Sequence, residues 1–125
     1  MLPKRQKVPR RLFIEALTKG RSIHSKYLSL RFLKSKELKQ SRFSFIVSSK
    51  VSKKATVRNL LKRRGYYIVR KNKKNISDQF IFLFFFSAKS GSAFGGKKTK
   101  TTDPFKELER EILTLFKKTG ILKNL

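Results

Sequence analysis

The 125-residue chain is poor in the side chains on which protein-borne catalysis depends. It has no cysteine, which excludes disulfides and cysteine-based metal sites and fits a reducing compartment. Its one histidine, His24, and its seven acidic residues form no convincing acid–base pair, and a carboxylate metal cage is not expected. No glycine spacing of the Walker or Rossmann kind is present. We therefore expect no catalytic residue and no metal ligand in this chain.

The sequence also has no long apolar run, and its first residues do not predict a secretory leader. The segment from Met1 to Val8 carries cations and a proline but no apolar stretch, which is not typical of a secretory signal. The most apolar run, Phe80–Phe86, is far too short to cross a bilayer as a helix. We expect it to be a buried strand that would promote aggregation if it were exposed. These features predict a cytoplasmic protein with no membrane partner.

Acidic residues are scarce, and cations dominate the chain. Lysine and arginine total 33 against 7 aspartate and glutamate, which gives a formal net charge of +26 and a pI near 11.2. Repulsion on that scale opposes compaction unless a polyanion compensates it. Hydrophobic residues make up 38% of the chain, enough for a core, so we expect one folded domain over residues 1–125. Nucleic acid is the expected partner, bound in a salt-dependent way.

Helical spacing of apolar residues appears in three parts of the chain. Gly20 supplies a stop for the first, and Asp103 followed by Pro104 supplies a start for the last. The last helix has its glutamates in the first half and its lysines near the end, which matches the helix dipole. The predicted helices cover 10–19, 53–71 and the segment from Pro104 to Gly120.

Strand-like alternation predicts three strands, at 27–33, 41–51 and 79–86. The last is apolar on both faces and is expected at the centre of the sheet. Residues 1–9 predict a basic extended arm, and residues 87–102 a flexible loop rich in glycine and lysine. The order helix, strand, strand, helix, strand, helix predicts an α+β fold in which helices pack on one sheet.

The segment from Lys53 to Arg64 is the most informative of the predicted helices. On a helix its cations and its apolar residues separate to opposite sides, and like charges four residues apart repel unless a partner neutralises them. A solvated basic face is the simplest interpretation, but the net charge favours phosphate as the partner. Gly65 is expected to be a weak point. The polar side carries Arg58, Asn59, Lys62, Arg63, Tyr66 and Arg70, and the apolar side Val57, Leu60, Leu61 and Ile68.

The same segment resembles the signature of the protein subunit of bacterial ribonuclease P. Residues 47–64, VSSKVSKKATVRNLLKRR, are similar to the family pattern V-S-K-K-V-G-K followed by A-V-x-R-N-x-x-K-R-R. Phe13, seven residues before Gly20, is placed as in the family's first helix, and residues 24–30 look like its first strand. Four departures stand out: Ser52 for a common glycine, Gly65-Tyr66-Tyr67 for the usual Leu-Arg-Glu, Phe85-Phe86-Ser87 without an expected cation, and the loop 87–102, which looks like an insertion.

The resemblance implies one mixed sheet, similar to that of a ribosomal-protein domain, with an unusual left-handed crossover at the central helix. It also implies that an RNA subunit removes the 5′ leader of precursor tRNA, with Mg²⁺ bound mainly by RNA and substrate. One protein would bind one RNA and would broaden its substrate and salt tolerance. The implied contacts to the RNA subunit are Lys50, Lys53, Lys54, Arg58, Asn59, Lys62, Arg63 and Arg64. The implied leader-binding cleft consists of Phe13, Leu17, Tyr27, Ser29 and Arg31.

The residues themselves fit this cleft. Tyr27, Ser29 and Arg31 alternate onto one strand face, Phe13 can reach it, and aromatic rings stack on single-stranded bases without sequence preference. The simpler interpretations are core packing for Phe13 and a surface position for Tyr27. A small basic ribosomal or other structural RNA-binding protein, and a general DNA-binding module, remain the alternative functions.

Overall fold

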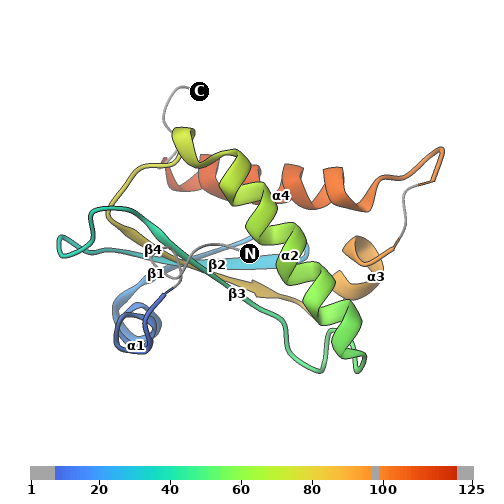
Figure 1. The fold of residues 1–125 in the computed structure, drawn as a ribbon, viewed down its shortest axis with the longest axis horizontal. Helices are drawn as coiled ribbons and strands as arrows, with labels where there is room; N and C mark the ends of the chain where they lie inside the picture. Colours follow the sequence, from blue (N-terminus) through green and yellow to red (C-terminus); the bar gives the residue numbers. More distant parts are fainter. Residues whose placement is uncertain (1–7, 97–98, 121–125) are drawn as a thin grey trace.

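The computed structural model describes residues 8–96 and 99–120, in which helices pack on both faces of one sheet (Figure 1). The predicted α+β class is confirmed, while most of the predicted arm at 1–9 lies outside the described residues. The elements are α1 (Arg10–Lys19), β1 (Arg21–His24), β2 (Leu28–Lys34), β3 (Arg42–Ile46), α2 (Ala55–Lys71), the 3₁₀-helix η2 (Lys73–Asn75), β4 (Phe80–Phe86), α3 (Ser90–Phe94) and α4 (Pro104–Thr119).

The sheet has the strand order β1-β2-β4-β3 and is mixed. β1 and β4 each pair antiparallel with β2, whereas β3 pairs in parallel with β4. Parallel neighbours need a crossover connection, and α2 supplies it between β3 and β4. The prediction that the phenylalanine-rich strand lies inside the sheet is confirmed, while the left-handed sense of the crossover stays a prediction.

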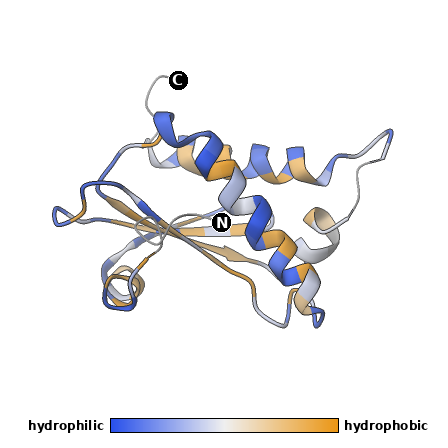
Figure 2. Ribbon diagram, in the orientation of Figure 1, coloured by the Kyte–Doolittle hydropathy of each residue, from blue (hydrophilic) through white to orange (hydrophobic). Residues whose placement is uncertain are grey.

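The two faces of β4 belong to two different hydrophobic clusters. Phe82 and Phe84 face the cluster under α2 and α4, where their rings stack on Phe43 and Phe45 of the parallel strand at 5.3 and 4.7 Å between centroids. Ile81 and Leu83 face a smaller cluster with the apolar side of α1. Figure 2 shows hydrophobic residues along the strands and mixed colouring on the helices. A strand buried on both faces explains the run Phe80–Phe86.

Several predicted boundaries differ from the structure. Residues 21–24 form the extra strand β1, so His24 ends a strand rather than starting one. The strand predicted at 41–51 ends at Ile46, although Val47 and Val51 beyond it are still buried. Between the predicted central helix and the last predicted strand, the structure has the short 3₁₀-helix η2, which the sequence did not predict. Short elements of this kind contain too few residues for a periodic pattern, so tertiary packing determines where they form and end.

The loop predicted as flexible at 87–102 contains the helix α3, and that prediction was wrong for this part. The Phe94 side chain is only 2% exposed and belongs to the larger hydrophobic cluster. The Ser90 hydroxyl is buried and donates to the Ser87 carbonyl oxygen at 2.6 Å. One phenylalanine among glycine, serine and lysine is therefore enough to anchor the segment on the core.

Gly65 is a point of close approach rather than the weak point that the sequence predicted. It is buried within α2, and a Cβ atom at this position would lie 2.5 Å from Cε1 of the Phe45 ring. That ring is stacked on Phe84 and has little room to shift. The absence of a side chain at Gly65 lets α2 lie directly on β3.

We expect the substitution Gly65→Ala to lower the free energy of unfolding by about 1–3 kcal/mol, because overpacking displaces the Phe45 ring. Helix propensity alone would favour alanine by about 1 kcal/mol, so the sign of the change is informative. Urea denaturation measures it. Gly96→Ala, where a Cβ would be 3.8 Å from the nearest atom, is the control and should change little. A Gly65→Ala protein as stable as the parent would contradict the close contact.

Candidate RNA interface

The cations predicted to contact RNA lie along α2 and in the turn before it. Lys50, Lys53, Lys54 and Arg63 are exposed, and Arg58, Lys62 and Arg64 are partly buried. α2 contains no acidic residue, and within residues 8–96 and 99–120 none of these cations forms an ion pair. Their positive charge is therefore uncompensated by the protein, which favours binding of a polyanion.

Two of the predicted RNA contacts also hold the protein together. Arg58 donates through Nη1 to the Ser52 carbonyl oxygen at 2.8 Å and thereby fixes the turn before α2. Arg64 donates through Nη1 to the carbonyl oxygens of Phe94 and Gly96, the latter at 3.2 Å. Arg64 therefore ties α3 to α2, a role that the sequence did not predict.

Tyr66 lies against the sheet and not on the polar side, where the sequence placed it. Its ring packs edge-on against Phe45 with 4.9 Å between centroids. Burial raises the pKa of the Tyr66 hydroxyl, and hydrogen bonds with the Phe45 backbone and the Ser44 side chain oppose that effect. The hydroxyl therefore stays protonated at neutral pH and helps to anchor α2 to the edge strand β3.

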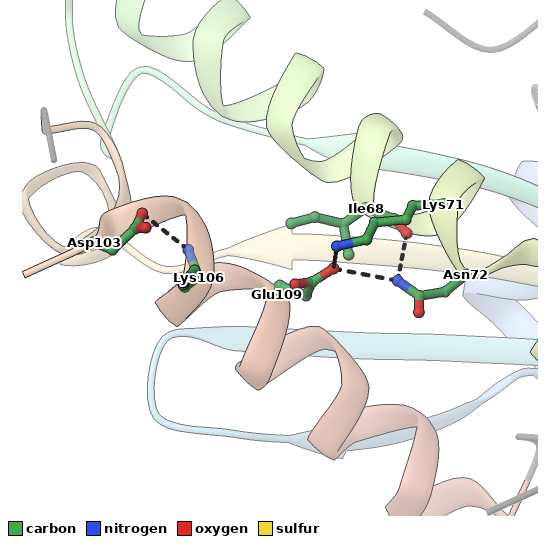
Figure 3. A network of polar contacts seen from close by, with 6 residues as sticks. All are labelled: Ile68, Lys71, Asn72, Asp103, Lys106 and Glu109. Atoms are coloured by element: carbon green, nitrogen blue, oxygen red, sulfur yellow. Dashed lines mark hydrogen bonds and ion pairs between the residues drawn. The ribbon is translucent and has the colours of Figure 1, made fainter.

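A polar network fixes α2 relative to α4 (Figure 3). Glu109 accepts from Lys71 Nζ at 3.3 Å and from Asn72 Nδ2 at 3.4 Å, and the same Asn72 nitrogen donates to the Ile68 carbonyl oxygen at 2.8 Å. At the start of α4, Asp103 accepts from the Lys106 amide at 3.3 Å and caps the helix as predicted. The network holds the Glu109 carboxylate at the end of α2.

Four of the five residues of the predicted leader cleft lie on the α1 face of the sheet. Phe13 is half-buried against the smaller cluster, and Leu17 is 38% exposed. Arg31 donates from Nε to the Ala16 carbonyl oxygen at 2.9 Å and from Nη1 to Ser22 Oγ at 2.8 Å. Ser29 Oγ lies 2.8 Å from His24 Nδ1. Arg31 thus joins the last turn of α1 to the sheet.

Tyr27 is the exception, because it lies on the opposite face from α1. It occupies the bend between β1 and β2, which breaks the alternation that the sequence analysis assumed. Its ring is edge-on to Phe94 at 5.4 Å, and its amide donates to Glu111 Oε1 at 2.9 Å. There it lines a cavity of about 700 Å³ with residues of α3 and α4. The predicted grouping of Tyr27 with Phe13 was wrong.

Phe85 is an aromatic side chain on the α1 face that the sequence analysis missed. It is half-buried, packs on the smaller cluster, and lies opposite Ser29 of β2 and Ile46 of β3. Strict alternation along Phe80–Phe86 was the signal that could have placed it there. Phe13, Phe85 and Ile46 together present partly exposed apolar surface beside α1.

Two further features bear on function. Among the described residues, no three histidine, cysteine or acidic side chains come together as a possible metal site. None of the described helices has the length and apolar character to cross a membrane.

Solved structures of ribonuclease P proteins share this fold. The protein from Thermotoga maritima, in complex with 1-(4-fluorophenyl)-2-thiourea, is 31% identical, with a TM-score of 0.72 over 85% of this chain and 92% of that one. The Staphylococcus aureus protein is 16% identical, with a TM-score of 0.78 over 94% of this chain and 98% of that one. A comparison with curated protein sequences gives no match.

The family comparison covers almost the whole chain. The model of the family described as Ribonuclease P matches residues 2–120, which include both the basic helix and the α1 face. The alternative of a ribosomal protein receives no support from any of these comparisons. The chain belongs to the ribonuclease P protein family and is the RNA-binding subunit of that enzyme.

Proposed function

We propose that this chain binds the RNA subunit through α2 and holds the 5′ leader of precursor tRNA on the α1 face, while the RNA carries out the cleavage. The observation that carries the proposal is the acid-free helix α2, whose cations form no ion pair with the described residues over the stretch from Arg58 to Arg64. One protein would bind one RNA, in the cytoplasm.

The geometry of α2 supports the first part. Arg58 and Lys62 are partly buried and share a face of α2 with Tyr66, which packs on Phe45 of β3, whereas Asn59 and Arg63 are exposed. Lys50, Lys53 and Lys54 extend the positive surface beyond the start of the helix. Lysine and arginine side chains that neutralise phosphates release counterions, which makes such binding strong at low salt.

The α1 face supports the second part. A single strand offers unpaired bases, and the partly exposed rings of Phe13 and Phe85 offer apolar surfaces for them. Ser29 and Arg31 lie beside these rings on the neighbouring strand. Because α2 and α1 cover opposite faces of the sheet, both ligands would be bound at the same time (Figure 1).

Catalysis is assigned to the RNA subunit, with Mg²⁺ held mainly by the RNA and the substrate. His24, the one histidine, is exposed, and its Nδ1 is engaged with Ser29. The protein would assist by holding substrate and by screening phosphate repulsion with fixed cations in place of mobile ions.

Removing two cations from α2 should change the salt dependence of RNA binding. For Lys62→Ala with Arg63→Ala, we expect weaker binding to the RNA subunit and a plot of log K against log salt that is shallower by about 0.7–0.9 for each phosphate that the variant no longer neutralises. The matched control is Lys36→Ala with Lys39→Ala, which removes the same charge from the exposed β2–β3 loop. An equal change in slope for both double variants would show only an effect of net charge.

Truncating the aromatic rings beside α1 should affect precursor and mature tRNA differently. We expect Phe13→Ala and Phe85→Ala each to weaken binding of precursor tRNA to the assembled enzyme by about 1–3 kcal/mol, because a base loses its stacking partner. Binding of mature tRNA, which has no leader, should not change. Leu12→Ala in the buried side of α1 controls for lost stability. If a variant binds both tRNAs more weakly and its melting temperature falls in parallel, the rings contribute only to the hydrophobic core.

Cleavage assays over a Mg²⁺ titration test where catalysis resides. We expect the purified protein alone to cut no precursor tRNA, the RNA alone to cut only at high Mg²⁺, and the mixture to cut at low Mg²⁺, because fixed cations replace mobile ones. His24→Ala should leave the chemical step of the mixture unchanged. Site-specific cleavage by RNA-free protein would overturn the assignment of catalysis to the RNA.

A further inference from the structure

Tyr67 has the most exposed large apolar side chain among the described residues. It is 59% exposed, compared with 51% for Ile14 and 38% for Leu17. The adjacent Tyr66 is packed against β3, so two neighbouring tyrosines have opposite surroundings. Folding alone explains Tyr66, but it leaves most of the Tyr67 ring in water.

Tyr67 lies between Arg63 and Arg70 on one face of α2. Asn59, Arg63, Tyr67 and Arg70 follow one another at intervals of four, four and three residues, which places them on one face of a helix. All four are exposed, and we call them the crest of α2. Neither Arg63 nor Arg70 forms an ion pair with the described residues. The ring therefore has an uncompensated cation one turn before it and another one turn after it.

Phe105 of α4 supports the ring from the side. The Tyr67 and Phe105 rings lie 5.5 Å apart at an interplanar angle of 64°, and Phe105 in turn packs on the larger hydrophobic cluster. The Lys71–Glu109 ion pair, one turn further along both helices, holds α2 and α4 together at this place. A ring held in this way loses less side-chain freedom on binding than a free one.

We propose that Tyr67 is a stacking site for one unpaired base of the RNA bound along α2, with Arg63 and Arg70 on the flanking phosphates. The inference rests on the proposed binding of the RNA subunit by α2. An apolar partner protein would leave both arginines without counter-charges, whereas RNA supplies a flat ring and phosphates together. Stacking tolerates any base, so the site selects an unpaired nucleotide and not a sequence.

Variants at Tyr67 separate stacking from charge. We expect Tyr67→Ala to raise the Kd for the RNA subunit by about 5- to 150-fold, the range for removal of one stacked base, without changing the salt slope. Tyr67→Phe should bind like the parent because it keeps the ring. Tyr67→Leu keeps apolar contact with Phe105 but has no aromatic face, so it should bind as weakly as Tyr67→Ala. Parent-like binding by Tyr67→Leu would overturn the proposal.

A fluorescence experiment gives an independent readout. The chain has no tryptophan, so Tyr67→Trp introduces a single reporter, and a base stacked on it should quench its emission when the RNA subunit binds. Ile14→Trp, at the exposed apolar position on α1, is the matched control and should not be quenched. Equal emission changes at both positions would overturn the proposal.

Arg63→Ala distinguishes a failure of this site from a failure of the interface. If Arg63→Ala makes the salt dependence shallower while Tyr67→Ala leaves the Kd unchanged, α2 binds RNA but no base stacks on Tyr67. If neither variant has an effect, the RNA subunit lies elsewhere and both proposals are wrong. Melting temperatures equal to that of the parent show that each variant is folded.

Discussion

Burial of β4 on both faces is the constraint on which the rest of the architecture depends. Alternate side chains of Phe80–Phe86 enter two separate clusters, so each face of the sheet needs its own cover. α1 covers one face, and α2 with α4 covers the other. Each covering helix is apolar on one side only, so its cations point to solvent. The central strand thereby produces two outer surfaces on opposite sides of the molecule, as the proposed binding of two RNA ligands requires.

None of the seven acidic residues lies in α2, so most of the positive charge of this helix is left uncancelled. Asp103, Glu107, Glu109 and Glu111 all belong to the start and first half of α4, where they complement the helix dipole or accept hydrogen bonds. Glu109 pairs with Lys71 at the end of α2. The remainder of α2 has no carboxylate partner among the described residues. Self-repulsion then lowers the stability of the free protein, and RNA relieves it, so binding and folding are coupled through the same charges.

The sequence predicted the elements whose hydrophobic pattern extends over many residues or whose start is marked by a helix cap. The helix at 53–71, the central strand and the start of α4 at Asp103 are each specified by many residues or by a local hydrogen bond. Predictions failed where a single tertiary contact determines the position of a segment or a side chain. Phe94 anchors α3 in a polar loop, a bend moves Tyr27 to the other face, and Tyr66 turns toward Phe45. Such contacts join residues far apart in the chain, which periodicity does not record.

The three residues Gly65, Tyr66 and Tyr67, which depart from the usual family pattern, act together in the structure. Without a side chain at Gly65, α2 lies directly on the Phe45 ring. That close approach brings Tyr66 against the same ring, where it packs edge-on at the edge of the sheet. Tyr67 is then left on the crest of α2, beside Phe105 and between two exposed arginines. The chain has a glycine and two aromatic rings where the usual pattern has a cation and a carboxylate. Loss of the carboxylate fits the proposed site, because an acidic side chain on the crest would repel the phosphates that we propose to lie beside Arg63 and Arg70.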